Sequence, residues 1–295
     1  MNHGQIIGAL ATVPELDRAI EDYSGVLGFE LAERGRVDAA LAHSWAAPGV
    51  AGARYAALRP PSGAPSTIRL VEQPAMPGYR PTTTFGWNAF EISVHDVFGW
   101  PDKLTGTGFE IVGLPREIPG LPYFVAMQMV GRGGEMIYLN EVREDTPTSD
   151  LPRAASAVDM VFIVILGTAD RESTVAWYRD RLKLDEGGSY TIEYTMINKA
   201  FGLPDGTPST ITMAQKGRMP IAEIDQYPPA AAARPVADGM LPPGNALVTL
   251  AVESLDALEL DWISPPAIRS GNPYDGRRTA TVRGPAGELL ELVEI

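Results

Sequence analysis

An internal repeat constrains the fold of this chain more than any other feature of its sequence. Tyr23 and Tyr178 lie about 155 positions apart, and each closes a short segment of helical pattern that follows an apolar stretch. The ends of the two halves also match, because GEMIYLNEV at residues 134–142 resembles GELLELVEI at residues 287–295 with almost the same offset. Agreement at separate places with one offset favours duplication over chance.

Each half of the chain divides once more into two similar units. Residues 90–96 and 248–254 are alternating apolar and polar stretches, and each leads into a short helical pattern, as residues 6–13 do at the start of the chain. The four units begin near residues 5, 86, 158 and 245. Each unit predicts a strand, one helix and further strands, so the sequence predicts an α+β fold.

Charge and composition exclude several classes of function. The chain has 24 Lys and Arg against 37 Asp and Glu, a net charge of −13. Nucleic acids and acidic membranes require clustered cations, and the sequence has no basic run, so neither is an expected partner. The chain has no cysteine, which excludes disulfides, thiolate nucleophiles and iron–sulfur ligation.

The chain is expected to form two domains of a cytoplasmic protein. Its 295 residues correspond to roughly two domains of about 150 residues. A polar, proline-bearing stretch at mid-chain predicts a linker at residues 146–154, between a first domain at residues 1–145 and a second at residues 155–295. The longest apolar run, residues 160–166, is far below the ~20 residues that cross a bilayer, and no signal peptide is evident. The oligomeric state stays open.

Two short motifs resemble those of a known superfamily. Asp22-Tyr23 followed by Val-Leu-Gly-Phe at residues 26–29 is close to the pattern "FY…LGF", and GELLEL at residues 287–292 is close to "DPdGnliEL". The chain is therefore similar to the vicinal oxygen chelate superfamily, which holds glyoxalase I, bleomycin-resistance proteins and extradiol dioxygenases. The resemblance implies four βαβββ modules, two per domain, whose curled mixed sheets pair to form a cup around a cavity.

Strand alternation indicates which side chains face these cups. Neighbouring residues of a strand point to opposite faces, and Phe90, Ile92 and Val94 must cover the helix side. On the opening strands the cup side then receives Gly8, Leu10 and Thr12; Ala89, Glu91, Ser93 and His95; Ile163 and Ile165; and Leu247, Thr249 and Ala251. On the closing strands it receives Arg69, Tyr138, Thr212 and Glu291.

The resemblance also implies a metal site, which this sequence does not supply. Metal-dependent members carry His, Gln or Glu at the first inward position of the opening strand, where this chain has Gly8, Ala89, Ile163 and Leu247. Of the closing-strand positions, only Glu291 matches the expected Glu. A divalent ion normally needs three or more protein donors, so we expect neither a metal nor another cofactor.

The first cup is predicted to hold a catalytic group of Arg69, Glu91 and Tyr138. A carboxylate near a guanidinium and a phenol can bind a polar ligand and move a proton. Arg69 and Tyr138 would then stabilise a developing oxyanion. The alternative is that Glu91 and Arg69 form only a structural ion pair. Further ligand-binding candidates in both cups are Ser93, His95, Glu291, Thr249, Thr212 and Tyr194.

Three candidates have a plain structural alternative. His95 lies beside Asp96 at a strand end, where a solvated cap is common. Trp45 lies in an alanine-rich predicted helix at residues 38–47, where packing or a pocket rim is expected. The long proline-bearing segment at residues 217–245 is predicted to be either a lid or strap over one cup that spans the two domains, or a stiff surface connector.

These expectations lead to three functional hypotheses. The first is a metal-independent enzyme with isomerase- or lyase-type acid/base chemistry on a small organic molecule, such as an aromatic or carbonyl-bearing compound. The second is a protein of the bleomycin-resistance type that binds or sequesters such a molecule without chemistry. The third is a metal-dependent glyoxalase or dioxygenase, which the ligand count argues against. Interior charge in the cups favours the enzyme, because burying charge costs folding energy that packing alone would not require.

Overall fold

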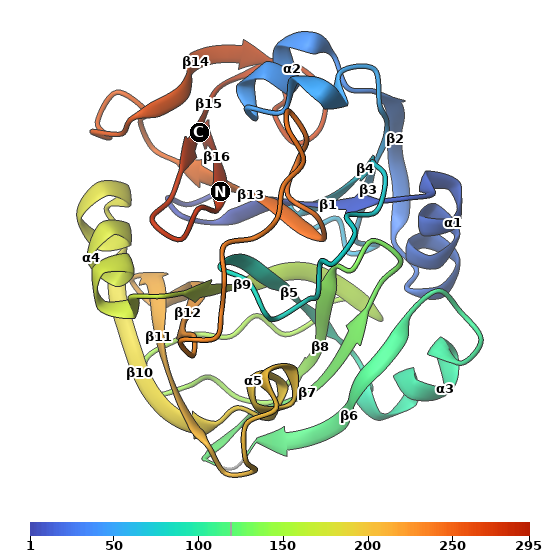
Figure 1. Ribbon diagram of the computed structural model, residues 1–295, viewed down its shortest axis with the longest axis vertical. Helices are drawn as coiled ribbons and strands as arrows, with labels where there is room; N and C mark the ends of the chain where they lie inside the picture. The colour runs from blue at the N-terminus through green and yellow to red at the C-terminus, as the bar shows by residue number, and fades with distance from the viewer. Residues whose placement is uncertain (119) are drawn as a thin grey trace.

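The computed structural model describes residues 1–118 and 120–295, and two curled eight-stranded sheets dominate it (Figure 1). The first and fourth units form one of them, here called the outer-unit sheet. Its strands in spatial order are β14 (Trp262–Arg269), β15 (Arg277–Arg283), β16 (Leu289–Glu294), β13 (Asn245–Val252), β1 (Ile6–Val13), β4 (Thr67–Glu72), β3 (Arg54–Arg59) and β2 (Glu30–Arg36).

The second and third units form the other sheet, here called the inner-unit sheet. Its strands in spatial order are β10 (Asp185–Glu193), β11 (Pro208–Lys216), β12 (Met219–Gln226), β9 (Val158–Thr168), β5 (Gly86–Val94), β8 (Met136–Val142), β7 (Leu121–Val130) and β6 (Glu110–Ile118). In both sheets the opening strand of a unit runs parallel to its closing strand, as β1 does to β4 and β5 to β8. The chain is thus an α+β protein of repeated units.

The expected pairing of the units within each half of the chain is wrong. The first unit joins the fourth where β1 runs antiparallel to β13, and the second joins the third where β5 runs antiparallel to β9. Residues 146–154 therefore connect two units of the same sheet. All four of these opening strands are apolar along most of their length, so the local pattern favours neither partner over the other.

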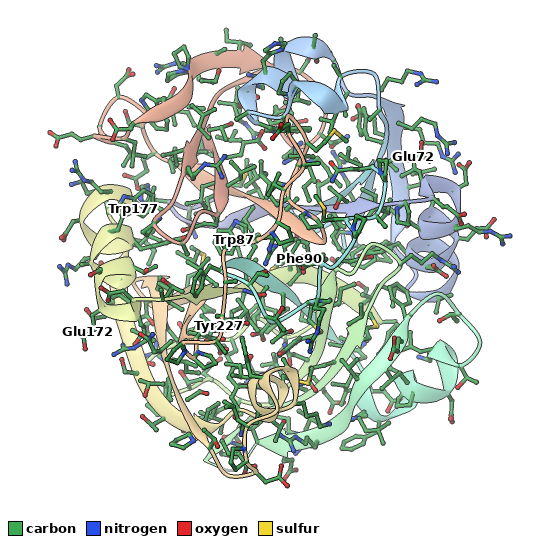
Figure 2. The ribbon with its side chains drawn as sticks, viewed as in Figure 1. Glu72, Trp87, Phe90, Glu172, Trp177 and Tyr227 are labelled. Atoms are coloured by element: carbon green, nitrogen blue, oxygen red, sulfur yellow. The ribbon has the colours of Figure 1, made fainter. Side chains whose placement is uncertain are left out.

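One hydrophobic core fills the layer between the two sheets. Trp87 and Phe90 of β5 lie in this layer, as Figure 2 shows, and both are buried. Helices α1 (Leu16–Ile20) and α4 (Arg171–Leu182) cover opposite sides of it (Figure 1). A short helix, α3 (Trp100–Leu104), adds Trp100 and Leu104 to the same core. The opposite, concave face of each sheet is left as a cup.

The sequence repeat has a direct structural counterpart in two tyrosine–glutamate hydrogen bonds. The Tyr23 hydroxyl at the end of the first unit's helix donates to Glu135, in the turn before β8, at 3.1 Å. The Tyr178 hydroxyl in α4 donates to Glu288, in the turn before β16, at 2.8 Å. Each bond joins a helix of one sheet to a turn of the other, so the repeated residues tie the two sheets together.

The segment at residues 217–245 differs from the loop that was expected. Its first part is strand β12, and only residues 227–244 form a connection, which crosses from the inner-unit to the outer-unit sheet. Arg234 anchors this connection by donating to the backbone oxygens of Trp87 and Asn245 at 2.5 and 2.7 Å. The connection is thus a fixed strap between the sheets. No helix within the two described ranges is long and apolar enough to cross a membrane.

Candidate functional site

The concave face of the outer-unit sheet, here called the outer cup, contains a fully paired carboxylate. Glu291 on β16 is completely buried, and its Oε2 accepts from Arg69 on β4 and from Thr249 on β13 at 2.7 and 2.8 Å. Its Oε1 accepts from the Trp45 indole at 2.9 Å and the Tyr274 hydroxyl at 2.8 Å. Every oxygen of the carboxylate is therefore used by the protein itself.

Side chains fill the outer cup. Trp45 follows helix α2 (Ala39–Ser44), which lies over the cup mouth (Figure 1). It packs with a buried apolar cluster whose other members are Leu10, Val37, Ala42, Ala47, Val50, Val71, Leu241, Ala246, Leu247 and Leu289. Burial alone would raise the pKa of Glu291, but the charge of Arg69 and the three neutral donors hold it below its ordinary value. The outer cup is therefore filled by side chains and contains a structural ion pair.

The concave face of the inner-unit sheet, here called the inner cup, brings together three carboxyl groups. Glu91 lies on β5, and Glu223 and Asp225 lie in the same phase on β12, so all three point to the cup side. Asn140 on β8 donates from its Nδ2 to Glu91 Oε2 at 2.6 Å. Glu91, Asp225 and Asn140 are at most 5% exposed, and Glu223 faces the cavity.

Burial raises the pKa of each of these carboxyl groups, and repulsion raises the pKa of two of them further. Burial is the largest cause for all three, and the charge of Glu223 further raises the pKa of Glu91 and of Asp225. The pKa of Glu223 is raised to about 7, although its polar neighbours Tyr194 and Asp225 oppose the shift.

Several polar atoms of the inner cup have no partner within the protein. Both carboxyl oxygens of Asp225 and the amide oxygen of Asn140 are buried without a hydrogen bond among the described residues. The Ser93 hydroxyl on β5 is also buried and unpaired. Buried polar atoms normally have partners, and orphaned ones mark a place that a ligand or water completes. The inner cup therefore offers unpaired polar atoms to a ligand, whereas in the outer cup both oxygens of the Glu291 carboxylate are already paired.

Aromatic side chains and a short helix enclose the inner cup. The Tyr194 hydroxyl donates to the Tyr138 hydroxyl at 3.2 Å across the cup. Tyr194 precedes helix α5 (Thr195–Phe201), which lies over the cup as α2 lies over the other (Figure 1). Arg116 on β6 donates to Thr195 at 2.5 Å at the rim. The enclosed space is about 40 Å³, enough for about three waters or a small chemical group.

The structure separates residues that were expected to share one site. Arg69 lies in the outer cup and Glu91 and Tyr138 in the inner cup, so the predicted catalytic trio is wrong as a group, and so is an ion pair between Arg69 and Glu91. The cause is the pairing of the units, which puts β4 and β5 in different sheets. Glu91, Tyr138 and Tyr194 do line one cavity.

The other expected ligand-binding residues are distributed as follows. Thr249 and Glu291 lie together in the outer cup. Thr212 lies on β11 rather than on a closing strand, and its hydroxyl bonds with Ser189 at 2.7 Å and accepts from Arg171. The exposed ring of His95 bonds the backbone oxygen of Ala154 at 2.7 Å, beyond the end of β5.

Four residues of the two cups were missed from the sequence: Glu223, Asp225, Asn140 and Tyr274. Residues 219–226, MPIAEIDQ, alternate with the period of a strand, and this signal places Glu223 and Asp225 in phase. Pro220 and the prolines from residue 228 onward favoured a loop instead. Proline is nevertheless tolerated at the start of a strand, where Pro220 lies.

The residues of the cups do not fit a metal ion. Among the residues that the structure describes, no group of three or more His, Asp or Glu side chains is arranged to hold one. In the outer cup the guanidinium of Arg69 neutralises the single carboxylate, and a cation beside it would be repelled. In the inner cup, Ala89 and Ile165 occupy inward positions of the two opening strands and have no donor atoms.

Comparison with known proteins supports the fold. Residues 5–130 match the family model described as the Glyoxalase/Bleomycin resistance protein/Dioxygenase superfamily. Glyoxalase I from Zea mays is similar in structure, with 18% identity, a TM-score of 0.62 and coverage of 98% of this chain and 92% of that one. A putative dioxygenase from Bacillus subtilis subsp. subtilis str. 168 has 11% identity, a TM-score of 0.60 and coverage of 99% and 86%. The search of curated proteins finds no match.

Proposed function

We propose, from the premise that this chain has the fold of the glyoxalase/bleomycin resistance protein/dioxygenase superfamily, that its inner cup binds a small organic molecule and exchanges a proton with it. The observation that carries this proposal is that Glu91 and Glu223 line one cavity, with Asp225 next to Glu223 along the same face of β12, and that no cation among the described residues is paired with them. The outer cup has the opposite character, because its carboxylate is neutralised and its space is filled.

The proton chemistry follows from the different environments of the carboxyl groups. A general base works best when its pKa is near the working pH, and Glu223, with a pKa of about 7, is half ionised at neutral pH. Burial and the charge of Glu223 raise the pKa of Glu91 well above its ordinary value, which favours its protonated form and suits it to be the matching acid. The pair is suited to removing a proton at one position of a ligand and returning it at another.

The two tyrosine hydroxyls supply the remaining function of the site. Burial raises the pKa of Tyr138 and of Tyr194 well above the ordinary value, so both phenols stay protonated at neutral pH. A protonated phenol in an enclosed site donates to an oxygen that gains negative charge as a proton leaves the neighbouring carbon. This arrangement supports isomerase- or lyase-type chemistry with residues of this chain alone.

Deuterium exchange tests the proposal without knowledge of the natural substrate. Hydroxyacetone, a small ketone with acidic C–H groups, is incubated with the protein in D2O, and loss of its α-proton signals is followed by 1H NMR. We expect exchange above the buffer rate, reduced at least tenfold in Glu223→Gln and in Glu91→Gln. The control Glu110→Gln removes an exposed carboxyl on β6 and leaves the rate unchanged. Equal rates in wild type and both cup variants would overturn the proposed chemistry.

Binding without chemistry is the second candidate, and one observation favours it. The inner cup contains a buried apolar cluster that includes Ala89, Met136, Ile165 and Met196, which suits retention of a ligand. Under this alternative, hydroxyacetone protects the protein against thermal unfolding, whereas its α-protons exchange at the buffer rate. The same pair of measurements therefore separates the enzyme from the sequestering protein.

A further inference from the structure

We propose that the molecule held in the inner cup is a small organic ammonium compound, whose positive charge lies among Glu91, Glu223 and Asp225. This inference rests on the proposed function of the cup and adds the chemical class of its ligand. It is carried by the charge balance, the hydrogen-bonding potential and the dimensions of the cavity.

The ionisable groups that face the cavity are mainly acids, and no cation among the described residues is paired with them. Glu91 faces the cavity from β5 and Glu223 from β12, and Asp225 lies next along the same face. Asn140, Tyr138 and Tyr194 face them and are neutral, and the remaining acid of the lining, Glu193 at the end of β10, is exposed. Among the described lining residues the one cation is Arg116, an exposed rim residue that donates to Thr195. A cationic ligand would supply the missing charge.

The unpaired atoms of the cup call for a hydrogen-bond donor. The amide nitrogen of Asn140 is occupied by Glu91, which leaves the buried amide oxygen with no partner among the residues described. Both carboxyl oxygens of Asp225 are likewise buried without a hydrogen-bond partner among the residues described. All three atoms accept hydrogen bonds, and an ammonium group provides three donors and no acceptor. A carboxylate or phosphate ligand would add acceptors where donors are needed.

The size and walls of the cavity agree with an ammonium head group. About 40 Å³ accommodates a group of a few heavy atoms, far less than the ~300 Å³ typical of sites for larger ligands. Tyr138, Tyr194 and Phe124 line the space. Aromatic faces attract cations, and the attraction grows when both partners are removed from water. Helix α5 would have to move for a longer ligand to enter.

Binding of an ammonium ion must be linked to loss of protons from the cup. Burial raises the pKa of Glu223 to about 7, so this carboxyl is partly protonated at neutral pH. A positive charge beside it lowers its pKa, so Glu223 releases its proton as the ligand binds. Affinity should therefore rise as the pH is raised through 7, until the ammonium ion itself loses its proton.

Three isosteric probes test the inference by isothermal titration calorimetry. Ethanolammonium carries the proposed charge, ethylene glycol has a hydroxyl in its place, and glycolate carries a negative charge. All titrations use one total ionic strength, at pH 6 and pH 8, in two buffers with different ionisation enthalpies. We expect ethanolammonium to bind at least tenfold more tightly than either other probe, more tightly at pH 8 than at pH 6, and with proton release. Glu223→Gln and Asp225→Asn should each weaken it at least tenfold, and Glu110→Gln should not.

The outcomes separate this inference from the proposed function. If ethylene glycol or glycolate binds as well as ethanolammonium, or if no probe binds, the ammonium inference is overturned. The hydroxyacetone exchange experiment then still decides the proton chemistry independently. Circular dichroism confirms folding of each variant, and Asp225→Asn replaces Glu223→Gln if the latter does not fold. Equal affinity of ethanolammonium for wild type and the folded cup variant would place its binding outside the inner cup and overturn the inference.

Discussion

Arg69 and Glu291 are 222 positions apart in the chain, yet Arg69 Nη2 donates to Glu291 Oε2 at 2.7 Å inside the outer cup. Both side chains are nearly or completely buried. The inner cup, built on the same pattern of strands, has Tyr138 and Glu223 on its closing strands and no such pair. One protein thus contains two related cups, of which one is neutralised and filled and the other is acidic and hollow.

The buried pair should contribute strongly to stability only while both members are present. Arg69→Met leaves Glu291 buried without its cation, and Glu291→Gln leaves Arg69 without its anion. Breaking a buried pair costs about 3–5 kcal/mol in the free energy of unfolding. The double substitution Arg69→Met/Glu291→Gln should lose less than the sum of the two single losses. Urea unfolding of all four proteins measures this, and strictly additive losses would contradict direct pairing.

The two tyrosine–glutamate bonds between the sheets should be equivalent. Tyr23→Phe and Tyr178→Phe each remove the side-chain donor to a buried carboxyl, at an expected cost of about 1–3 kcal/mol. The two losses should be similar and additive, because the bonds lie in separate repeats. Thermal or urea unfolding tests this, with Tyr123→Phe as a control at a half-buried tyrosine. A loss in one variant alone would show that the repeat is not energetically symmetric.

Stability should fall as the pH rises from about 4.5 to 7. Burial raises the pKa of Glu135, Glu223 and Glu288 from 4.5 to about 7, so the folded chain binds more protons than the unfolded chain in this range. The stability from this source is complete below pH 4.5 and is lost as the pH passes 7. Glu223→Gln removes one such group and should flatten the curve by an amount on the order of 3 kcal/mol across the range. An unchanged slope would show that Glu223 titrates normally.

The contact between Arg116 and Thr195 should restrain helix α5. Arg116→Ala removes the donor that holds the start of the helix to β6. An exposed hydrogen bond is worth about 1 kcal/mol, so amide hydrogen exchange in residues 197–201 should become about fivefold faster. Arg143→Ala, which breaks an exposed ion pair with Glu117, is the matched control. Unchanged exchange in α5 would show that this contact does not control entry to the inner cup.

The sequence predicted the repeat, the α+β class and the inward phase of several strands, because these depend on local periodicity. Glu91 and Tyr138 were placed on cup faces by alternation along β5 and β8, and the structure has both in one cavity. The pairing of units was predicted wrongly, because a unit with apolar opening strands can join either neighbour. That choice depends on contacts between residues such as Gly8 and Thr249, which are far apart in the chain.

Two features of the site were not predicted from the sequence, for different reasons. Glu291 was expected to bind a ligand, but its actual partners are protein groups from β4, β13, the loop before β15 and the segment after α2. Such a convergence exists only in three dimensions. Glu223 and Asp225 were not predicted to face the cup, because the prolines around them favoured a loop over the strand that their alternation indicates.

Methionine methyl NMR tests most directly whether the inner cup, and not the outer cup, is the ligand site. Met136 and Met196 belong to the apolar cluster of the inner cup, whereas Met240 packs against the cluster that fills the outer cup. In protein labelled with [13C-methyl]methionine, titration with ethanolammonium and with hydroxyacetone should shift the signals of Met136 and Met196 and leave that of Met240 in place. Saturable shifts of Met240, with Met136 and Met196 unmoved, would contradict the account.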